Sequence, residues 1–200
     1  QDSMGSAELW QQAEQALAKS LDSAKMPYDL RPGDGAFYGP KIDFDVKDAL
    51  GRSFTLSTVQ LDFQMPERFE LTYVDKDNSL KRPVMIHRAI LSTFERFVGL
   101  LTEHYAGKFP TWLSPVQARV LPISEKVEHY AQKVVKELHA AGVRVEIDAS
   151  AETLNKKIRE AQLAQVPYIL VVGEKEQMDK TVAVRTRNGK QHAPKSVELF

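Results

Sequence analysis

A change of residue pattern halfway along the chain constrains the fold more than any other feature of the sequence. Before residue 107, short segments with strand-like alternation follow one another across tight turns, whereas strand-like and helix-like segments alternate after residue 115. The segment between them, GKFPTWLSP at 107–115, contains one glycine and two prolines, which interrupt regular structure. We therefore expect two domains, residues 1–112 and 113–200, each long enough to bury its own core.

The first region predicts an antiparallel sheet backed by helices. Ser6 is a suitable cap for a helix whose apolar residues recur at helical spacing as far as Pro27. Apolar and charged residues alternate over 42–47, as they do in a half-buried strand. The elements expected after it are strands at 54–63, 69–74 and 83–86, and then an amphipathic helix at 88–105. Successive strands followed by one long helix are typical of an α+β arrangement.

The second region predicts a compact α/β domain with a mostly parallel sheet. Its pattern indicates strands at 116–121, 143–147, 167–172 and 182–187, and helices at 124–141 and 152–164. A β-α-β-α-β order implies helical crossovers, which join parallel neighbours. Over both regions, the expected fold class is α/β (α+β): an antiparallel sheet with helices, followed by an α/β domain with a mostly parallel sheet.

The composition excludes several classes of protein. The longest apolar runs are about as long as a strand, far short of the roughly 20 residues that span a bilayer, and nothing at the start of the chain resembles an export signal. The chain has no cysteine, which excludes disulfides, a thiolate nucleophile and a cysteine-built metal site within it and suits a reducing cytosol. Its 27 basic and 27 acidic residues divide unequally, with a net charge of −3 over residues 1–112 and +3 over residues 113–200.

Two segments of the first region could shape a ligand pocket. The segment GDGAFYGPK at 33–41 contains three glycines, which permit close backbone approach, and it would present Tyr38 and Lys41 from a loop. It could also be a plain glycine-rich hairpin, because such a loop alone is weak evidence for a ligand. In the next strand, three polar residues share one face, which would line a pocket or else face solvent: Thr58, Gln60 and Asp62.

The segment MIHRAILSTFER at 85–96 combines an imidazole with a guanidinium. His87 lies at the expected junction of strand and helix, where it could be a metal ligand. Thr93 and Arg96 would share one helix face, and an arginine there could hold a phosphate through two hydrogen bonds. The alternatives are a hydrogen-bonded structural histidine and a surface Glu95–Arg96 pair, because a metal site needs more than one ligand.

Basic residues of the second region could form a nucleic-acid surface, with Tyr168 available for stacking. They lie near the start of a helix and along the last strand and turn: Lys156, Lys157, Arg159, Arg185, Arg187 and Lys190. Acidic residues nearby make ordinary solvated charge an equally good interpretation.

Taken together, five segments resemble the class II threonyl-tRNA synthetases, and they occur in the family's order. They are GAFYGPKI at 35–42, TVQLDF at 58–63, RPVMIHRAIL at 82–91, ERF at 95–97 and FPTWLSPVQ at 109–117. Each segment is unspecific by itself, but the resemblance covers nearly the whole chain. It implies that residues 1–112 are the later part of a class II catalytic domain and that residues 113–200 are most of an anticodon-binding domain.

The resemblance implies a catalytic role for Lys41 and Arg96 and a metal-binding role for His87. Arg96 matches the arginine of the third class II motif, which holds the ATP tail as pyrophosphate leaves, and Mg²⁺ would accompany the ATP. His87 matches one of the family's zinc ligands. In this family the zinc is thought to bind the amino and hydroxyl groups of threonine, a chelate that valine cannot complete.

The resemblance also implies binding roles. Tyr38 and Lys41 would face the amino acid or its adenylate, where Lys41 is a fixed positive charge near the carboxylate or α-phosphate. The residues expected to line the ribose and amino-acid pocket are Thr58, Gln60 and Thr93. The residues expected to contact the tRNA anticodon are Arg159, Glu176 and Arg185.

Several residues of the family's pattern are missing. A cysteine and a second histidine, the other two expected zinc ligands, would precede residue 1, as would the first two class II motifs. Thr55 stands where many members have a glutamine, and Ala164 and Gln165 stand where a basic pair is common.

The resemblance therefore implies part of a threonine–tRNA ligase. Such an enzyme activates threonine with ATP and transfers it to tRNA(Thr), and we expect a cytoplasmic homodimer. The 200 residues alone are expected to be inactive without the first two class II motifs. The alternative is a non-catalytic tRNA-binding or regulatory paralogue, although a pure binder has no need of Lys41, His87 and Arg96 together.

Overall fold

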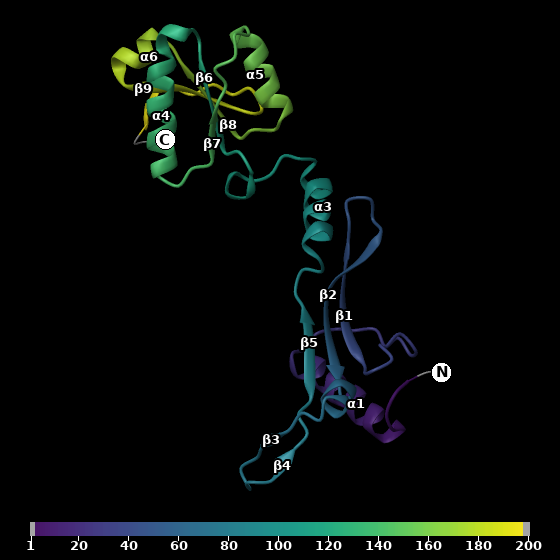
Figure 1. Cartoon of the computed structure of the whole chain (residues 1–200). Helices are drawn as coiled ribbons and strands as arrows, with labels where there is room; N and C mark the ends of the chain where they lie inside the picture. Colours follow the sequence, from purple (N-terminus) through teal and green to yellow (C-terminus); the bar gives the residue numbers. More distant parts are fainter. Residues whose placement is uncertain (1–2, 198–200) are drawn as a thin grey trace. The chain divides into compact units, whose positions relative to one another are not determined.

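The computed structural model describes residues 3–197, which form two compact units (Figure 1). Unit 1 ends at Leu101 and unit 2 begins at Thr102, and each has a sheet of its own. The division lies inside helix α3 (Phe94–Tyr105), ahead of the predicted boundary between residues 112 and 113, which stays a prediction.

Unit 1 is built on a three-stranded antiparallel sheet, as the alternating pattern predicts. The strands pair in the order β1 (Lys41–Lys47), β2 (Ser53–Asp62) and β5 (Met85–Ala89). The helix α1 (Ala7–Ser23) precedes the sheet, and the Oγ of Ser6 caps it by accepting a hydrogen bond from the backbone N–H of Leu9 at 3.2 Å.

The long helix of unit 1 begins later than the sequence pattern predicts. Arg88 and Ala89 belong to β5, and Ser92 then takes a left-handed φ of 59°, which a continuous helix cannot contain. Thr93 caps α3, because its Oγ1 accepts a hydrogen bond from the backbone N–H of Arg96 at 3.4 Å. Thr93 is therefore the helix cap, and His87 lies within a strand and not at its junction with the helix.

Three further short elements lie between β2 and β5. The segment predicted as a strand at 69–74 forms only the two-residue strand β3 (Tyr73–Val74), which pairs with β4 (Leu80–Lys81). The helix α2 (Gln64–Arg68) follows β2 directly and is not indicated by the sequence pattern.

Unit 2 follows the predicted β-α-β-α-β order. Its elements are η1 (Thr111–Leu113), β6 (Ala118–Pro122), η2 (Glu125–Val127), α4 (Glu128–Ala140), β7 (Val145–Ile147), α5 (Leu154–Leu163), β8 (Tyr168–Val172), α6 (Glu174–Asp179), β9 (Thr181–Thr186) and β10 (Lys195–Ser196). The sheet order is β10, β9, β8, β6, β7. Strand β6 pairs in parallel with β7 and β8, whereas β9 and β10 join antiparallel, so the sheet is mixed. The α/β class is confirmed, with the parallel pairings confined to three of the five strands.

The core of unit 2 lies on both faces of its sheet. Figure 1 shows α4 and α5 on opposite sides of the strands. Side chains buried on the α4 side include Ala131, Val134 and Leu138 of the helix itself, and those on the α5 side are Leu121, Ala161, Ile169 and Val171. Two packed layers of this kind are enough to make unit 2 a self-contained domain.

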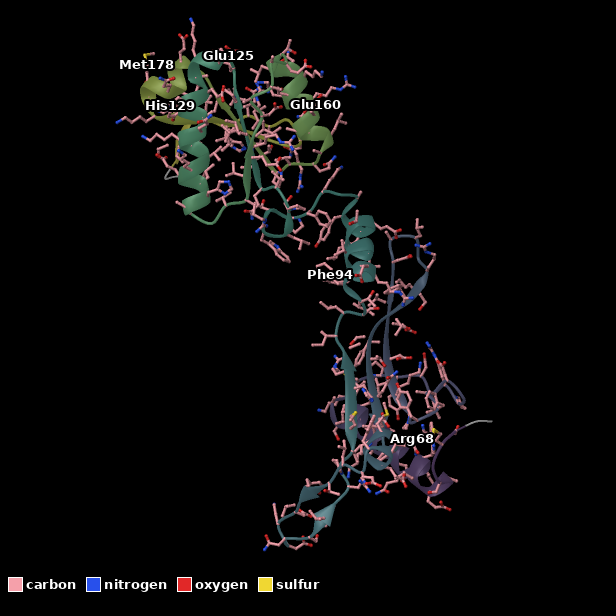
Figure 2. All side chains as sticks on the ribbon, in the orientation of Figure 1. Arg68, Phe94, Glu125, His129, Glu160 and Met178 are labelled. Carbon is pink, nitrogen blue, oxygen red and sulfur yellow. The ribbon has the colours of Figure 1, made fainter. Side chains whose placement is uncertain are left out.

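Unit 1 leaves most of its large apolar side chains in contact with water. Among its described residues, the buried apolar side chains are small ones such as Ala13 and Pro66, whereas Phe37, Ile86 and Ile90 are more than 60% exposed. Phe94, labelled at the start of α3 in Figure 2, is 80% exposed. The expectation of a separate buried core is met by unit 2 and not by unit 1. No helix within the described residues has the length and apolar character needed to cross a membrane.

Candidate functional site

One face of the unit 1 sheet collects the polar residues that the sequence singles out. Lys41 pairs with Gln60, and Gln60 pairs on its other side with His87. Because directly opposed residues of neighbouring strands point to the same face, these three side chains form a row across all three strands. The same register and alternation add Thr58 and Asp62 to this face, as predicted for β2. We call it the polar face.

The glycine-rich segment lies directly against β2, and Gly39 makes this possible. A Cβ atom at Gly39 would be only 1.9 Å from the carbonyl oxygen of Leu61. The backbone of Pro40 accepts a hydrogen bond from the N–H of Leu61 at 3.1 Å, which fixes the loop in this position. The loop presents Tyr38 to the polar face, where its hydroxyl lies 2.5 Å from Oε1 of Gln60.

His87 and Asp62 form a hydrogen-bonded pair on the polar face. Nε2 of His87 is 2.8 Å from Oδ2 of Asp62, and the ring of Tyr38 meets the imidazole edge-on at a centroid distance of 5.7 Å. Asp62 is 1% exposed, and its other oxygen accepts from the backbone N–H groups of Gln64 and Met65. Burial acts to raise the pKa of Asp62, but these hydrogen bonds outweigh it and hold the pKa of the carboxyl below its ordinary value.

Lys41 has its charge compensated by neighbouring carboxylates. Its Nζ is 2.6 Å from Oδ2 of Asp43 and 4.0 Å from Oδ1 of Asp34. The hydrogen bond to Asp43 is the main reason that the pKa of Lys41 is raised, so the amine remains protonated. A cavity of about 790 Å³ lies beside it, between α1, the segment 27–37 and β1, with Lys41 and Asp43 in its wall. An anionic ligand at Lys41 would have to compete with Asp43.

A register shift and an unpartnered hydroxyl also bear on the polar face. A register shift next to Asp45 pairs that residue with Thr55, whose Oγ1 donates to Oδ1 of Asp45 at 2.6 Å. The Oγ1 of Thr58 is buried, and no described residue forms a hydrogen bond with it. Because a buried hydroxyl without a partner is costly, Thr58 is a position at which a polar ligand atom could be accommodated.

Arg96 lies apart from the Tyr38–Gln60–His87 row. The Arg96 guanidinium lies 6.0 Å from the ring centroid of Phe54, which precedes Gln60 by six residues along β2, or about 20 Å of strand. Thr93 is occupied in capping α3. The polar face thus brings together Tyr38, Lys41, Thr58, Gln60 and His87, and places the arginine toward the other end of β2.

The polar face contains one of the ligands needed by the zinc ion that the resemblance implies. His87 is a single ligand, and no cluster of three histidine, aspartate or glutamate side chains suited to a metal occurs in residues 3–197. The buried carboxylate at Nε2 does fit, because metal-binding histidines usually donate their second ring N–H to a carboxylate or carbonyl. Residues 3–197 therefore offer one ligand with a carboxylate partner. Sequence reasoning placed Asp62 on this face but missed its pairing with His87.

In unit 2 the three predicted anticodon residues do not form one cluster. Arg159 is exposed on α5. Arg185 pairs with Ile169 near the amino end of β8, and Gln191 can accept from its guanidinium at 3.0 Å and 3.1 Å. Glu176 follows the carboxyl end of β8, about 13 Å of strand away, and its Oε2 accepts from the backbone N–H of Gly173. The three side chains thus span a surface wider than one base.

The proposed basic surface must exclude Lys157. This side chain is 4% exposed, and its Nζ lies 3.1 Å from the carbonyl oxygen of Asp148 and 3.4 Å from that of Pro122. It therefore joins the carboxyl ends of β6 and β7 inside the unit and is not available to a nucleic acid. Lys156, one position earlier, is exposed and paired with Glu152 at 2.6 Å.

Comparisons with known proteins agree with this architecture. The family described as "tRNA synthetase class II core domain (G, H, P, S and T)" matches residues 4–105, and the family described as "Anticodon binding domain" matches residues 117–199. The threonine–tRNA ligase of Symbiobacterium thermophilum is 58% identical over 100% of this chain, which covers 31% of that protein. That of Acetivibrio thermocellus is 53% identical over 100% of this chain, which covers 32% of it.

A solved structure shows the same fold. The crystal structure of the RNA binding domain of threonyl-tRNA synthetase from Cryptosporidium parvum Iowa II matches with a TM-score of 0.91 and 48% identity, covering 100% of this chain and 50% of that chain. The chain spans about a third of the length of the curated relatives it matches. It belongs to the class II tRNA synthetase family, and its similarity to the threonine–tRNA ligases extends through both units.

Proposed function

We propose that this chain acts as part of a threonine–tRNA ligase, which activates threonine with ATP to threonyl-adenylate and transfers it to tRNA(Thr). The observation that carries the proposal is the polar face, on which Tyr38, Gln60 and His87 are held in contact on one side of the sheet. The names of the relatives support the choice of threonine. We also propose that the enzyme is a homodimer and that it acts in the cytoplasm.

The polar face would hold the amino acid and its adenylate. The Tyr38 hydroxyl and the Gln60 amide form a rigid pair that can orient a polar ligand. The ammonium of Lys41 would attract the carboxylate or α-phosphate, and its raised pKa keeps that charge at neutral pH. Thr58 would contribute its unpartnered hydroxyl to the ribose or amino-acid pocket. Thr93 would line that pocket from the start of α3, where its Oγ1 also caps the helix.

Arg96 would bind the phosphates of ATP, together with Mg²⁺. Arg96 is exposed, and its guanidinium forms no ion pair with the described residues. Its one ring contact among them is with Phe54. A planar, permanently charged group of this kind suits bidentate phosphate binding.

His87 would hold the zinc ion together with ligands from outside residues 3–197. When bound, zinc would supply a Lewis acid that engages the hydroxyl and amino groups of threonine and so distinguishes it from valine. The contribution of this chain is one imidazole, oriented by Asp62 and by the ring of Tyr38.

Unit 2 would bind the anticodon stem-loop of tRNA(Thr). Arg159, Glu176 and Arg185 are the proposed contacts, and their spread over α5, α6 and β9 suits several nucleotides of a single-stranded loop. Ala164 and Gln165 replace a common basic pair, so the arginines carry more of the electrostatic attraction.

Threonine-dependent pyrophosphate exchange, measured on the enzyme that carries this chain, tests the proposal. We expect exchange with threonine and not with valine, and loss of both exchange and bound zinc in His87→Ala. The matched control is His104→Ala, at a histidine in α3 that lies outside the polar face. Binding of tRNA(Thr) without any exchange would instead support the non-catalytic paralogue. The 200 residues alone are expected to show no exchange.

A further inference from the structure

We propose that Asp62 is a positioning residue that fixes His87 in the tautomer with a proton on Nε2, and so makes Nδ1 the atom that binds the metal. The inference rests on the proposed function, because it concerns how the implied zinc ion would be held. Two observations support it: Nε2 of His87 lies 2.8 Å from Oδ2 of Asp62, and that carboxylate is almost completely buried.

The position of the Asp62 carboxylate is fixed by contacts other than the one with His87. Its Oδ1 accepts from the backbone N–H of Gln64 at 2.9 Å and from that of Met65 at 3.0 Å, which closes the first turn of α2. Its backbone belongs to β2, in register with Met85 of β5. The carboxylate is therefore fixed by a strand on one side and by a helix on the other.

The chemistry of the pair then determines the tautomer. A carboxylate only accepts hydrogen bonds, so the ring nitrogen that faces it must carry a proton. In a neutral imidazole the other nitrogen, Nδ1, keeps its lone pair, which is the form that binds a metal ion. The side chain of His87 is 41% exposed while that of Asp62 is 1% exposed, so the imidazole meets a buried, fixed carboxylate at Nε2 and is not itself enclosed by the described residues.

A simpler explanation is that Asp62 only caps α2. The variant Asp62→Asn separates the two roles, because its amide oxygen can still accept from Gln64 and Met65. The amide NH₂ would then face His87 Nε2 as a donor, so the lone pair must move to Nε2 and the proton to Nδ1. A capping role predicts no such reversal.

The tautomer can be measured without any metal. In the ¹⁵N-histidine-labelled chain at alkaline pH, two-bond ¹H–¹⁵N correlation spectra should show His87 with its proton on Nε2, and in Asp62→Asn on Nδ1. The matched control is Asp48→Asn, which changes a carboxylate that also accepts from two backbone N–H groups but lies in the turn after β1. It should leave His87 as in the wild type. A wild-type proton on Nδ1, or an unchanged tautomer in Asp62→Asn, would overturn the proposal.

Zinc affinity supplies the second measurement. In the enzyme that carries this chain, competition with a chelator should show zinc bound about 10- to 100-fold more weakly in Asp62→Asn, the usual effect of losing such a partner. Asp48→Asn should bind zinc as the wild type does. Equal affinity in Asp62→Asn despite a reversed tautomer would refute the positioning role. A wild-type enzyme without zinc would refute the zinc assignment of the proposed function, and with it the metal role of Asp62, whatever the tautomer.

Discussion

The close approach of Gly39 to β2 makes a quantitative prediction about the loop that carries Tyr38. In Gly39→Ala the new Cβ would lie 1.9 Å from the carbonyl oxygen of Leu61, and non-bonded contacts of this kind do not fall below about 3.0 Å. The loop or the strand must therefore move by about 1.1 Å. The obstacle is backbone, and Leu61 is paired with Ile86 of β5, so no side-chain rotation can relieve the contact.

The expected destabilisation of unit 1 is roughly 2–4 kcal/mol. Overpacking of a fitted site costs about 1–3 kcal/mol, and loss of the hydrogen bond between Leu61 and Pro40 adds about 1 kcal/mol. For a domain of this size, the melting temperature should fall by at least about 10 °C. In the enzyme that carries this chain, scanning calorimetry should show the transition that includes unit 1 moving down while that of unit 2 stays in place.

Gly99→Ala is the matched control, because a Cβ at Gly99 would meet no atom within 4 Å. Gly99 lies inside α3, where alanine is preferred by about 0.5–1 kcal/mol, so this variant should be as stable as the wild type or slightly more stable. A Gly39→Ala variant that melts within about 2 °C of the wild type, or equal destabilisation of the two alanine variants, would show that Gly39 is not required for the close approach of the loop to β2.

Three further predictions concern unit 2. Lys157→Ala should destabilise it by about 2–4 kcal/mol in denaturant titrations, because one buried and one half-buried carbonyl group lose their donor. Lys156→Ala should have little effect, and equal losses in the two variants would contradict the burial of Lys157. Glu176→Ala should lower stability by about 0.5–1 kcal/mol through loss of the cap on Gly173, and Glu176→Gln, which can still accept this bond, should lose less. The pKa of Asp148 is lowered: burial opposes this, but the hydrogen bonds from Ser150 outweigh burial, with help from the charge of Lys157. The stability that this carboxylate contributes is therefore present above the ordinary pKa of aspartate and lost as the pH falls below it, and Asp148→Asn should flatten the loss in acid unfolding curves between about pH 5 and pH 2.

The sequence predicted which side chains of β2 share a face but not what stands opposite them. The alternation of polar and apolar residues determines the shared face of Thr58 and Gln60, because side chains alternate along any strand. The position of His87 opposite Gln60 depends on the pairing of β2 with β5, which are separated by the α2 and β3–β4 segment. Register across such a long connection is set by tertiary packing, so the contact between His87 and Asp62 could not be derived from spacing.

The predicted start of α3 is wrong for a different reason. Apolar residues recur at helical spacing from Ile90, so the pattern predicts a helix that begins at Arg88. The left-handed turn at Ser92 and the cap at Thr93 outweigh that periodicity. The sequence did contain this signal, since a Ser-Thr pair ahead of an apolar run is typical of a helix start.

The position of Lys157 could also have been predicted. Interpreted by charge alone, it belongs with its basic neighbours, but it lies four residues before Ala161 and three after Leu154, on the buried face of α5. Helical periodicity therefore indicates its burial where composition does not.

The uneven distribution of buried apolar residues has a consequence for synthesis. Residues 3–101 leave the ribosome before residues 102–197, and the earlier segment is the one that exposes Phe37, Ile86 and Phe94 to water. The later segment can complete its core from its own two layers. Among residues 3–197, unit 1 therefore presents exposed apolar surface before unit 2 has been synthesised, so it is the part of this chain expected to bind a chaperone or to aggregate first.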